Sequence, residues 1–223
     1  MVRTKLKNRP FPDYTKGEEI FNMVSHAVGA ALGIVALVLT VVFSAKSGSA
    51  WAVTGSAIYG ASLVLLYSVS AVYHGLHKNM GKQVMRVLDH CTIYFLIGGT
   101  YTPILLTVIR EASPIAAWGL FGVVWGLAAT ATVFTAIDLK KYSLLSMICY
   151  IGMGWSILLC LPVALAAIPR TGLILLFLGG VAYTVGAVLY GIGKRCRYMH
   201  SVFHLFVVVG SVLQFLSIFF YVI

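Results

Sequence analysis

Acidic residues, and charged residues generally, are scarce in this sequence. Its 223 residues include only six aspartates and glutamates against 16 lysines and arginines, and charged residues of both signs make up 10% of the chain. Hydrophobic residues make up 60%, and the mean hydropathy is +0.96. This composition excludes an ordinary soluble domain and indicates an integral membrane protein.

The sequence lacks the motifs of nucleotide-binding proteins and of serine hydrolases. The sequence contains no G-x-x-x-x-G-K-[ST] or G-x-G-x-x-G loop and no G-x-S-x-G elbow, so nucleotide chemistry and serine hydrolysis have no support. The basic residues are not interleaved with aromatic ones, so the net charge of +10 does not indicate a nucleic-acid partner. We expect the basic loops to lie against the anionic headgroups of membrane lipids.

The four cysteines lack the C-x-x-C spacing of metal and redox sites. Cys91, Cys149 and Cys160 fall in apolar stretches, and Cys196 lies in a basic loop that we place on the cytoplasmic side. Reduced thiols are therefore expected, with no thiolate ligand for a metal.

Long apolar stretches fill nearly the whole chain, and about 20 such residues cross the ~30 Å hydrocarbon core as a helix. We predict an all-α integral membrane protein, a seven-transmembrane helix bundle. Residues 1–19 form a cytoplasmic tail without the apolar region of a cleaved signal peptide, and residues 20–223 form the membrane domain. The predicted spans are residues 20–45, 51–76, 87–109, 114–137, 143–165, 171–192 and 199–223.

The distribution of lysine and arginine predicts the orientation of this bundle. All but Lys46, Arg110 and Arg170 lie in the N-terminal tail or in the second, fourth and sixth loops. Because cytoplasmic loops carry the excess of basic residues, we predict the N-terminus inside and the C-terminus outside. The expected location is a bacterial inner membrane.

Two histidines one helical turn apart, His200 and His204, open the last predicted span. Side chains at i and i+4 share a helix face, so both imidazoles can bind one ion, and zinc is the metal that such ligands favour. His74 ends the second span at the same predicted depth. Since polar side chains inside a membrane are costly, their convergence predicts a zinc site rather than three isolated interfacial histidines.

Two further polar residues accompany these histidines. Asp89, at the inner start of the third span, is predicted to orient a zinc-bound water or to act as general base; a direct zinc ligand and a salt bridge with Arg86 are the alternatives. Ser70 lies one turn before His74, where its hydroxyl can support the imidazole or bond to its own backbone.

A weaker polar seam lies on the first span, where Glu19, Asn22 and His26 follow one another at helical spacing. A structural hydrogen-bond network between helices explains this seam as well as a catalytic one does. His77 and His90 have no partner at helical spacing, and we interpret both as interfacial.

Together these residues resemble the hemolysin III family. The matching motifs are Glu19-x-x-Asn22-x-x-x-His26, Ser70-x-x-x-His74, Asp89-His90, Gly99-Thr100-Tyr101-Thr102-Pro103 and His200-x-x-x-His204. That family looks like the bacterial branch of the progestin and adipoQ receptors, in a superfamily that includes the alkaline ceramidases. The resemblance implies seven helices with a cytoplasmic N-terminus, a zinc ion held by His74, His200 and His204, and Asp89 in contact with the zinc-bound water.

The resemblance leaves several activities open. Our preferred hypothesis is a ceramidase-like zinc hydrolase acting on a lipid amide or ester that enters from the bilayer, because three-histidine zinc with an open position activates water. The alternatives are a zinc-stabilised regulator of membrane homeostasis without turnover and a hemolysin-like, pore-forming cytolytic protein. A hemolysin-like pore needs a polar lining along its whole length, whereas the polar residues here lie mainly in the inner half. An ion or proton transporter lacks an acidic relay in the outer half.

The remaining motifs are interpreted as packing features. Gly29-x-x-x-Gly33 and Gly122-x-x-x-Gly126 are expected to let helices of the same bundle approach closely. Pro103 is expected to kink the third span.

Overall fold

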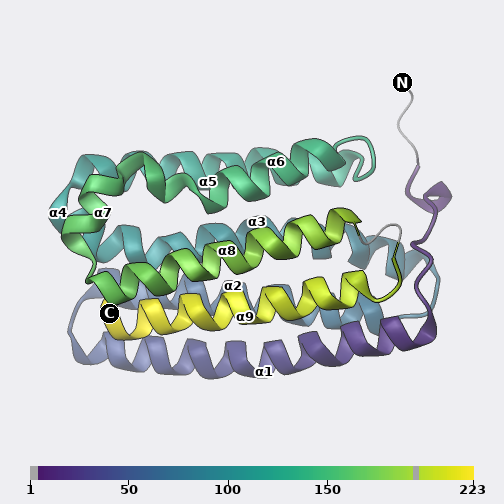
Figure 1. Ribbon diagram of the computed structural model, residues 1–223, viewed down its shortest axis with the longest axis horizontal. Helices are drawn as coiled ribbons and strands as arrows, with labels where there is room; N and C mark the ends of the chain where they lie inside the picture. The colour runs from purple at the N-terminus through teal and green to yellow at the C-terminus, as the bar shows by residue number, and fades with distance from the viewer. Residues whose placement is uncertain (1–4, 193–195) are drawn as a thin grey trace.

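The computed structural model describes residues 5–192 and 196–223, and the regular secondary structure in this part of the chain is entirely helical. Seven of its helical segments are long and apolar enough to cross a membrane. They run back and forth along the long axis of the molecule (Figure 1). The prediction of a seven-helix, multi-pass membrane protein is therefore confirmed. Arg3, Lys194 and Arg195, which contributed to the predicted orientation, lie outside the described residues.

The seven spans are built from nine α-helices and two other helical segments. They comprise α1 (Lys16–Lys46), α2 (Ala50–Gly75), α3 (Met80–Ile104) continued by the π-helix η2 (Leu105–Ile109) and α4 (Arg110–Ala112), α5 (Pro114–Ile137), α6 (Ser143–Gly154) continued by the 3-10 helix η3 (Ser156–Cys160) and α7 (Leu161–Ala167), α8 (Arg170–Ile192) and α9 (Met199–Tyr221). A short 3-10 helix, η1 (Leu6–Asn8), precedes them.

Two spans begin earlier than predicted because their first turns are polar. Helix α1 begins at Lys16, where the side chain of Thr15 and that of Glu18 form a reciprocal capping box. Helix α3 begins at Met80, where Asn79 Oδ1 accepts a hydrogen bond from the backbone N–H of Lys82 at 2.9 Å. These caps bring charged residues that looked like loop residues into the first turns of the helices.

The third span is the most buried of the seven and changes its helical pitch after Pro103. Proline has no N–H and crowds the preceding turn, so the regular hydrogen-bond ladder fails there. Residues Leu105–Ile109 form a π-helix, and the hydroxyl of Thr107 donates to the carbonyl of Pro103 at 2.6 Å. A π-helical segment is one of the usual causes of a helix kink, and this one begins two residues after the proline at which we predict a kink.

The two glycine motifs play different parts. A Cβ added at Gly29 would lie 2.5 Å from Cδ1 of Tyr67, so this face of α1 packs directly on α2. A Cβ at Gly122 or Gly126 would meet no atom within 4 Å. The interpretation as internal packing is confirmed for the first motif and wrong for the second, because α5 turns the second motif away from the bundle.

The polar candidates all meet at one end of the bundle. The beginnings of α1, α3 and α9 and the end of α2 lie there, opposite the C-terminus (Figure 1). Residues 5–15 cross this end and are held to it by side chains. Arg9 donates to the carbonyl of Ile137 at 2.7 Å, and Gln83 donates to the carbonyl of Arg9 at 2.5 Å. The segment before α1 is therefore part of the packed structure.

Candidate metal centre

Three histidines from two helices converge at this end. His74 comes from the last turn of α2, and His200 and His204 come from the first two turns of α9. One ring nitrogen from each lies within 4.8 Å of the others, and all three residues are buried. Among the described residues, no other cluster of three or more histidine, cysteine, aspartate or glutamate side chains is placed to hold a metal ion.

The nitrogen atoms of this cluster fit a zinc ion. The Nε2 atoms of His200 and His204 are 3.1 Å apart, close to the ~3.3 Å that separates two tetrahedral zinc ligands at a Zn–N distance of about 2.05 Å. The Nε2 atom of His74 is buried and has no hydrogen-bond partner. A buried, unpaired acceptor lowers stability, and a shared cation would remove that penalty. Three neutral imidazoles with a fourth position free are a common ligand set for catalytic zinc.

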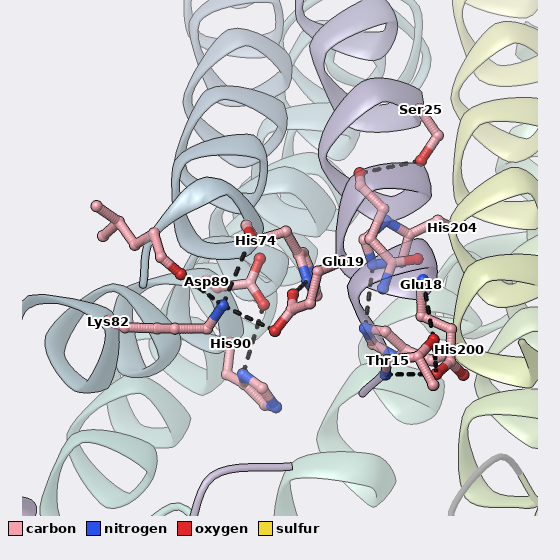
Figure 2. Close-up of polar contacts among 12 residues, drawn as sticks. Thr15, Glu18, Glu19, Ser25, His74, Lys82, Asp89, His90, His200 and His204 are labelled. Carbon is pink, nitrogen blue, oxygen red and sulfur yellow. Dashed lines mark hydrogen bonds and ion pairs between the residues drawn. The ribbon is translucent and has the colours of Figure 1, made fainter. Parts of the chain in front are cut away.

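The carboxylate of Glu19 orients the first of these ligands. Its Oε2 atom lies 2.6 Å from Nδ1 of His74, and its Oε1 atom accepts a hydrogen bond from the ammonium of Lys82 at 2.8 Å. Figure 2 shows Glu19 between these two side chains. When Nδ1 donates its proton to a carboxylate, the lone pair of Nε2 is free for a metal. Glu19 therefore selects the tautomer of His74 that a metal site needs.

Lys82 completes this arrangement from α3. Its side chain is only 3% exposed, and its ammonium also donates to the carbonyl of Leu76 at 2.9 Å. A buried cation beside Glu19 favours the ionised carboxylate, which is the form that accepts from His74. Helices α1, α2 and α3 are thus tied together immediately beside the cluster.

Two aromatic rings cover the other histidines. Tyr14, just before α1, stacks on His200 with ring centroids 4.9 Å apart, and His26 of α1 stacks on His204 at 3.7 Å. Burial raises the pKa of Tyr14 well above its ordinary value, so its hydroxyl remains protonated. Asn22, one turn before His26, is fully buried with no partner for its amide. The seam on α1 therefore lies against the cluster.

A cavity of about 140 Å³ opens beside the histidines. Ser70, Asp89 and His200 are among the polar residues that line it. Most of the remaining wall is apolar, contributed by residues such as Leu66, Ile93, Leu96, Ile97, Phe203 and Val207. Asp89 lines the cavity but does not belong to the three-histidine group.

Comparison with known proteins agrees with this architecture. The family model described as "Haemolysin-III related" matches residues 14–215. This chain belongs to the haemolysin-III related family. It is 38% identical over 208 residues to the Hemolysin-3 homolog of Bacillus subtilis (strain 168), covering 93% of this chain and 96% of the relative. It is 37% identical over 205 residues to Hemolysin-3 of Bacillus cereus, with 92% of each chain covered.

The similarity of this haemolysin-III related chain extends beyond bacteria. It is 28% identical over 208 residues to the human Monocyte to macrophage differentiation factor, covering 90% of this chain and 83% of that protein. No solved structure matches the chain. The family resemblance inferred from the motifs is thus confirmed.

The structure places the other predicted site residues as follows. Ser70 is buried and lines the cavity, but no hydrogen bond joins its hydroxyl to His74 among the described residues. The alternative salt bridge between Arg86 and Asp89 is not formed; Arg86 donates instead to the carbonyl of Pro10 at 2.8 Å. The Asp89 carboxylate lies 3.7 Å from Nδ1 of His90.

One prediction about the histidines is wrong. His90 was expected at the membrane interface, yet it lines the cavity with Asp89, and its Nε2 atom lies 3.3 Å from the hydroxyl of Tyr190. The reason is that α3 belongs to the most buried of the seven spans. The adjacent helix faces that carry Asp89 and His90 therefore both point into the bundle. His77, by contrast, is exposed just after the end of α2.

Sequence reasoning missed three residues that shape this haemolysin-III related site. Lys82 looked like one of many basic loop residues, and nothing in its sequence context marks it as buried. Tyr14 likewise carries no local signal. Glu18 had one, because Thr15-x-x-Glu18 is the pattern of a capping box. Its Oε1 atom also accepts from the backbone N–H of Tyr198 at 2.7 Å, which holds the N-cap residue of α9, two residues before His200.

The carboxylate of Glu19 gives a direct prediction. Glu19→Gln removes the charge that orients His74 and leaves Lys82 buried beside a neutral amide, so we expect zinc affinity to fall about 10–100-fold. Affinity is measured in detergent by competition with a chelator of known zinc affinity. Glu111→Gln, an exposed glutamate at the far end of the bundle, is the matched control. Equal affinity in wild type and Glu19→Gln would contradict the assigned role.

Proposed function

We propose that this chain is a zinc-dependent hydrolase that cleaves an amide or ester bond of a membrane lipid. The observation that carries the proposal is the convergence of three buried histidine ligand atoms within 4.8 Å, beside a cavity that Asp89 also lines. Structural zinc sites almost always use four protein ligands, whereas catalytic sites keep one position open. The described group offers three, which favours turnover over a purely structural metal.

Each residue then has a definite task. His74, His200 and His204 would hold the zinc. When bound, zinc lowers the pKa of water to about 7 and polarises a carbonyl oxygen. Glu19 keeps His74 in its metal-binding tautomer, and Asp89 accepts the proton of the attacking water and returns it to the leaving group. His26 and Tyr14 hold the imidazoles of His204 and His200 in place by stacking.

The apolar wall of the cavity suits an acyl group. A cavity of about 150 Å³ holds one benzene molecule, so the 140 Å³ beside the histidines accommodates a short acyl segment. The rest of a lipid chain would extend beyond it. A substrate bound this way places its carbonyl near the polar residues and its first methylenes against leucine, isoleucine and phenylalanine side chains.

A pore is less well supported. Several hydroxyl groups deeper in the bundle are bonded to one another, which leaves them less able to line a continuous polar path. Ser44 Oγ lies 2.7 Å from Ser56 Oγ, and the hydroxyls of Tyr67 and Tyr183 lie 2.7 and 2.8 Å from Ser211 Oγ. The name hemolysin describes the relatives, and for this chain the cavity and the histidines favour hydrolysis.

The end of the bundle that carries the site would face the cytoplasm. Residues 5–15, the loops between α2 and α3 and between α5 and α6, and the start of α9 lie together there (Figure 1). Most of the lysines and arginines lie in or beside these segments. With this orientation, which the positive-inside rule supports, the histidines would lie near the inner headgroup level.

The proposal is tested by turnover. Zinc-loaded protein in lipid nanodiscs is incubated with a panel of acyl amides and acyl esters, and released fatty acid is measured by mass spectrometry. We expect release from at least one class, lost after chelation and restored by zinc. A protein that holds one zinc per chain yet releases no fatty acid from any lipid in the panel would instead be a zinc-stabilised regulator.

A further inference from the structure

A second, larger cavity lies at the same end of the bundle. Its volume is about 690 Å³, and it is bounded by the N-terminal segment and by the ends of α3, α5 and α9. We call it the vestibule. His200 and Tyr190 line both the vestibule and the apolar cavity, and Tyr14 lines the vestibule while stacking on His200. The histidine cluster therefore stands between an apolar space and a polar one.

The acidic groups of the vestibule are largely committed to the fold. Glu18 accepts hydrogen bonds from Thr15 and from the backbone of Tyr198. Asp138 accepts from the backbone N–H groups of Lys140 and Lys141 at 3.2 and 3.1 Å, which holds the turn between α5 and α6. Asp13 is the remaining carboxylate among the described residues of the wall.

Three cations of the wall can contribute to binding a ligand, although one of them, Arg197, also attracts the nearby carboxylate of Glu18. Arg86, Lys140 and Arg197 come from α3, the α5–α6 turn and the α8–α9 loop, and none of them forms an ion pair of 4 Å or less among the described residues. Arg86 uses one nitrogen on the carbonyl of Pro10, while its Nε atom is buried without a partner. An unpaired buried N–H is costly, and an anion would satisfy it.

We propose that the vestibule binds the phosphate group of an anionic ester, with its remaining portion directed towards His200. Guanidinium and ammonium groups bind phosphate oxygens by charge-assisted hydrogen bonds, and arginine can do so in a bidentate way. Two sources share this chemistry, a phospholipid headgroup and a soluble phosphate monoester. The lipid source rests on the proposed function, since it puts the headgroup in the vestibule and the acyl group in the apolar cavity.

Cys196 provides a reporter, because its exposed thiol lines the vestibule, whereas Cys91 and Cys160 are buried. The rate of maleimide labelling at Cys196 is followed by peptide mass spectrometry, with a chelator present so that no turnover occurs. The probes are lysophosphatidylglycerol, the uncharged monoacylglycerol of the same chain length, and glycerol 3-phosphate. We expect lysophosphatidylglycerol to slow labelling at least fivefold and monoacylglycerol to leave the rate unchanged.

The variant Arg86→Gln/Lys140→Gln/Arg197→Gln should lose this protection. The matched control, Lys46→Gln/Arg110→Gln/Arg170→Gln, removes the same charge from the other end of the bundle and should keep it. The ratio of rates with and without probe is compared within each variant, which cancels any change in thiol reactivity. The double variant Lys140→Gln/Arg197→Gln alters only exposed side chains, so a partial loss there is expected even if the triple variant folds poorly.

The probes also separate the two sources. Protection by lysophosphatidylglycerol alone assigns the pocket to a lipid headgroup, and equal protection by glycerol 3-phosphate assigns it to a soluble ester. Equal protection by monoacylglycerol, or protection that survives in the triple and double variants, would overturn phosphate recognition. Because labelling of Cys196 is measured without zinc, protection by a phosphate probe would stand even if the protein hydrolysed no lipid. Equally, hydrolysis of a lipid would stand even if no phosphate probe protected Cys196.

Discussion

The double variant His200→Ala/His204→Ala is expected to contain no zinc, whereas the wild-type chain should contain one zinc per molecule. The physical reason is that two of three ligands disappear and His74 alone cannot hold the ion. Metal content is measured by plasma mass spectrometry after purification in detergent without added metal. His77→Ala, which removes an exposed histidine near the same end, should keep its zinc. Full zinc occupancy in the double variant would refute the site.

The same experiment has a stability readout. A zinc ion bound by His74 and His204 would link α2 to α9, and a ligand at 100 times its dissociation constant stabilises the folded state by about 2.7 kcal/mol. We therefore expect the melting temperature of wild type to fall on chelation and to rise again with zinc. The histidine variant should melt at one temperature whether zinc is present or not.

Asp89→Asn is expected to retain zinc and to lose hydrolysis by roughly 10²–10⁴-fold, the usual contribution of a general base. Asparagine keeps the size of the side chain but cannot accept the proton of water. Zinc content and fatty-acid release are measured on the same preparation, and Asp89→Ala should behave alike. Asp13→Asn, a carboxylate of the vestibule wall that makes no ion pair among the described residues, is the control and should retain full turnover.

The two readouts distinguish the roles that remained open for Asp89. If zinc were lost from Asp89→Asn as completely as from the histidine variant, Asp89 would be a fourth ligand and the site would be closed. The structure favours retention of zinc by Asp89→Asn, because Asp89 lies outside the group of ligand atoms. Retained zinc with unchanged turnover would exclude Asp89 from the chemistry.

Several properties of this protein follow from local sequence alone. The seven spans were predictable because each apolar stretch has to satisfy its own backbone hydrogen bonds in the membrane, and a helix does so without help from other segments. The pairing of His200 with His204 was predictable for the same reason, since helical periodicity places i and i+4 on one face. His74 could be added because span lengths determine depth.

The contacts between helices were decided only by the tertiary structure. Glu19 and Lys82 are separated by 63 residues, yet their ion pair orients His74. The inward position of His90 and the outward position of Gly122 depend on how α3 and α5 are rotated about their own axes. In a chain that is apolar on nearly every helix face, hydrophobicity does not specify that rotation. Close packing at small residues and pairing of the few polar side chains specify it instead, and these form only when the helices assemble.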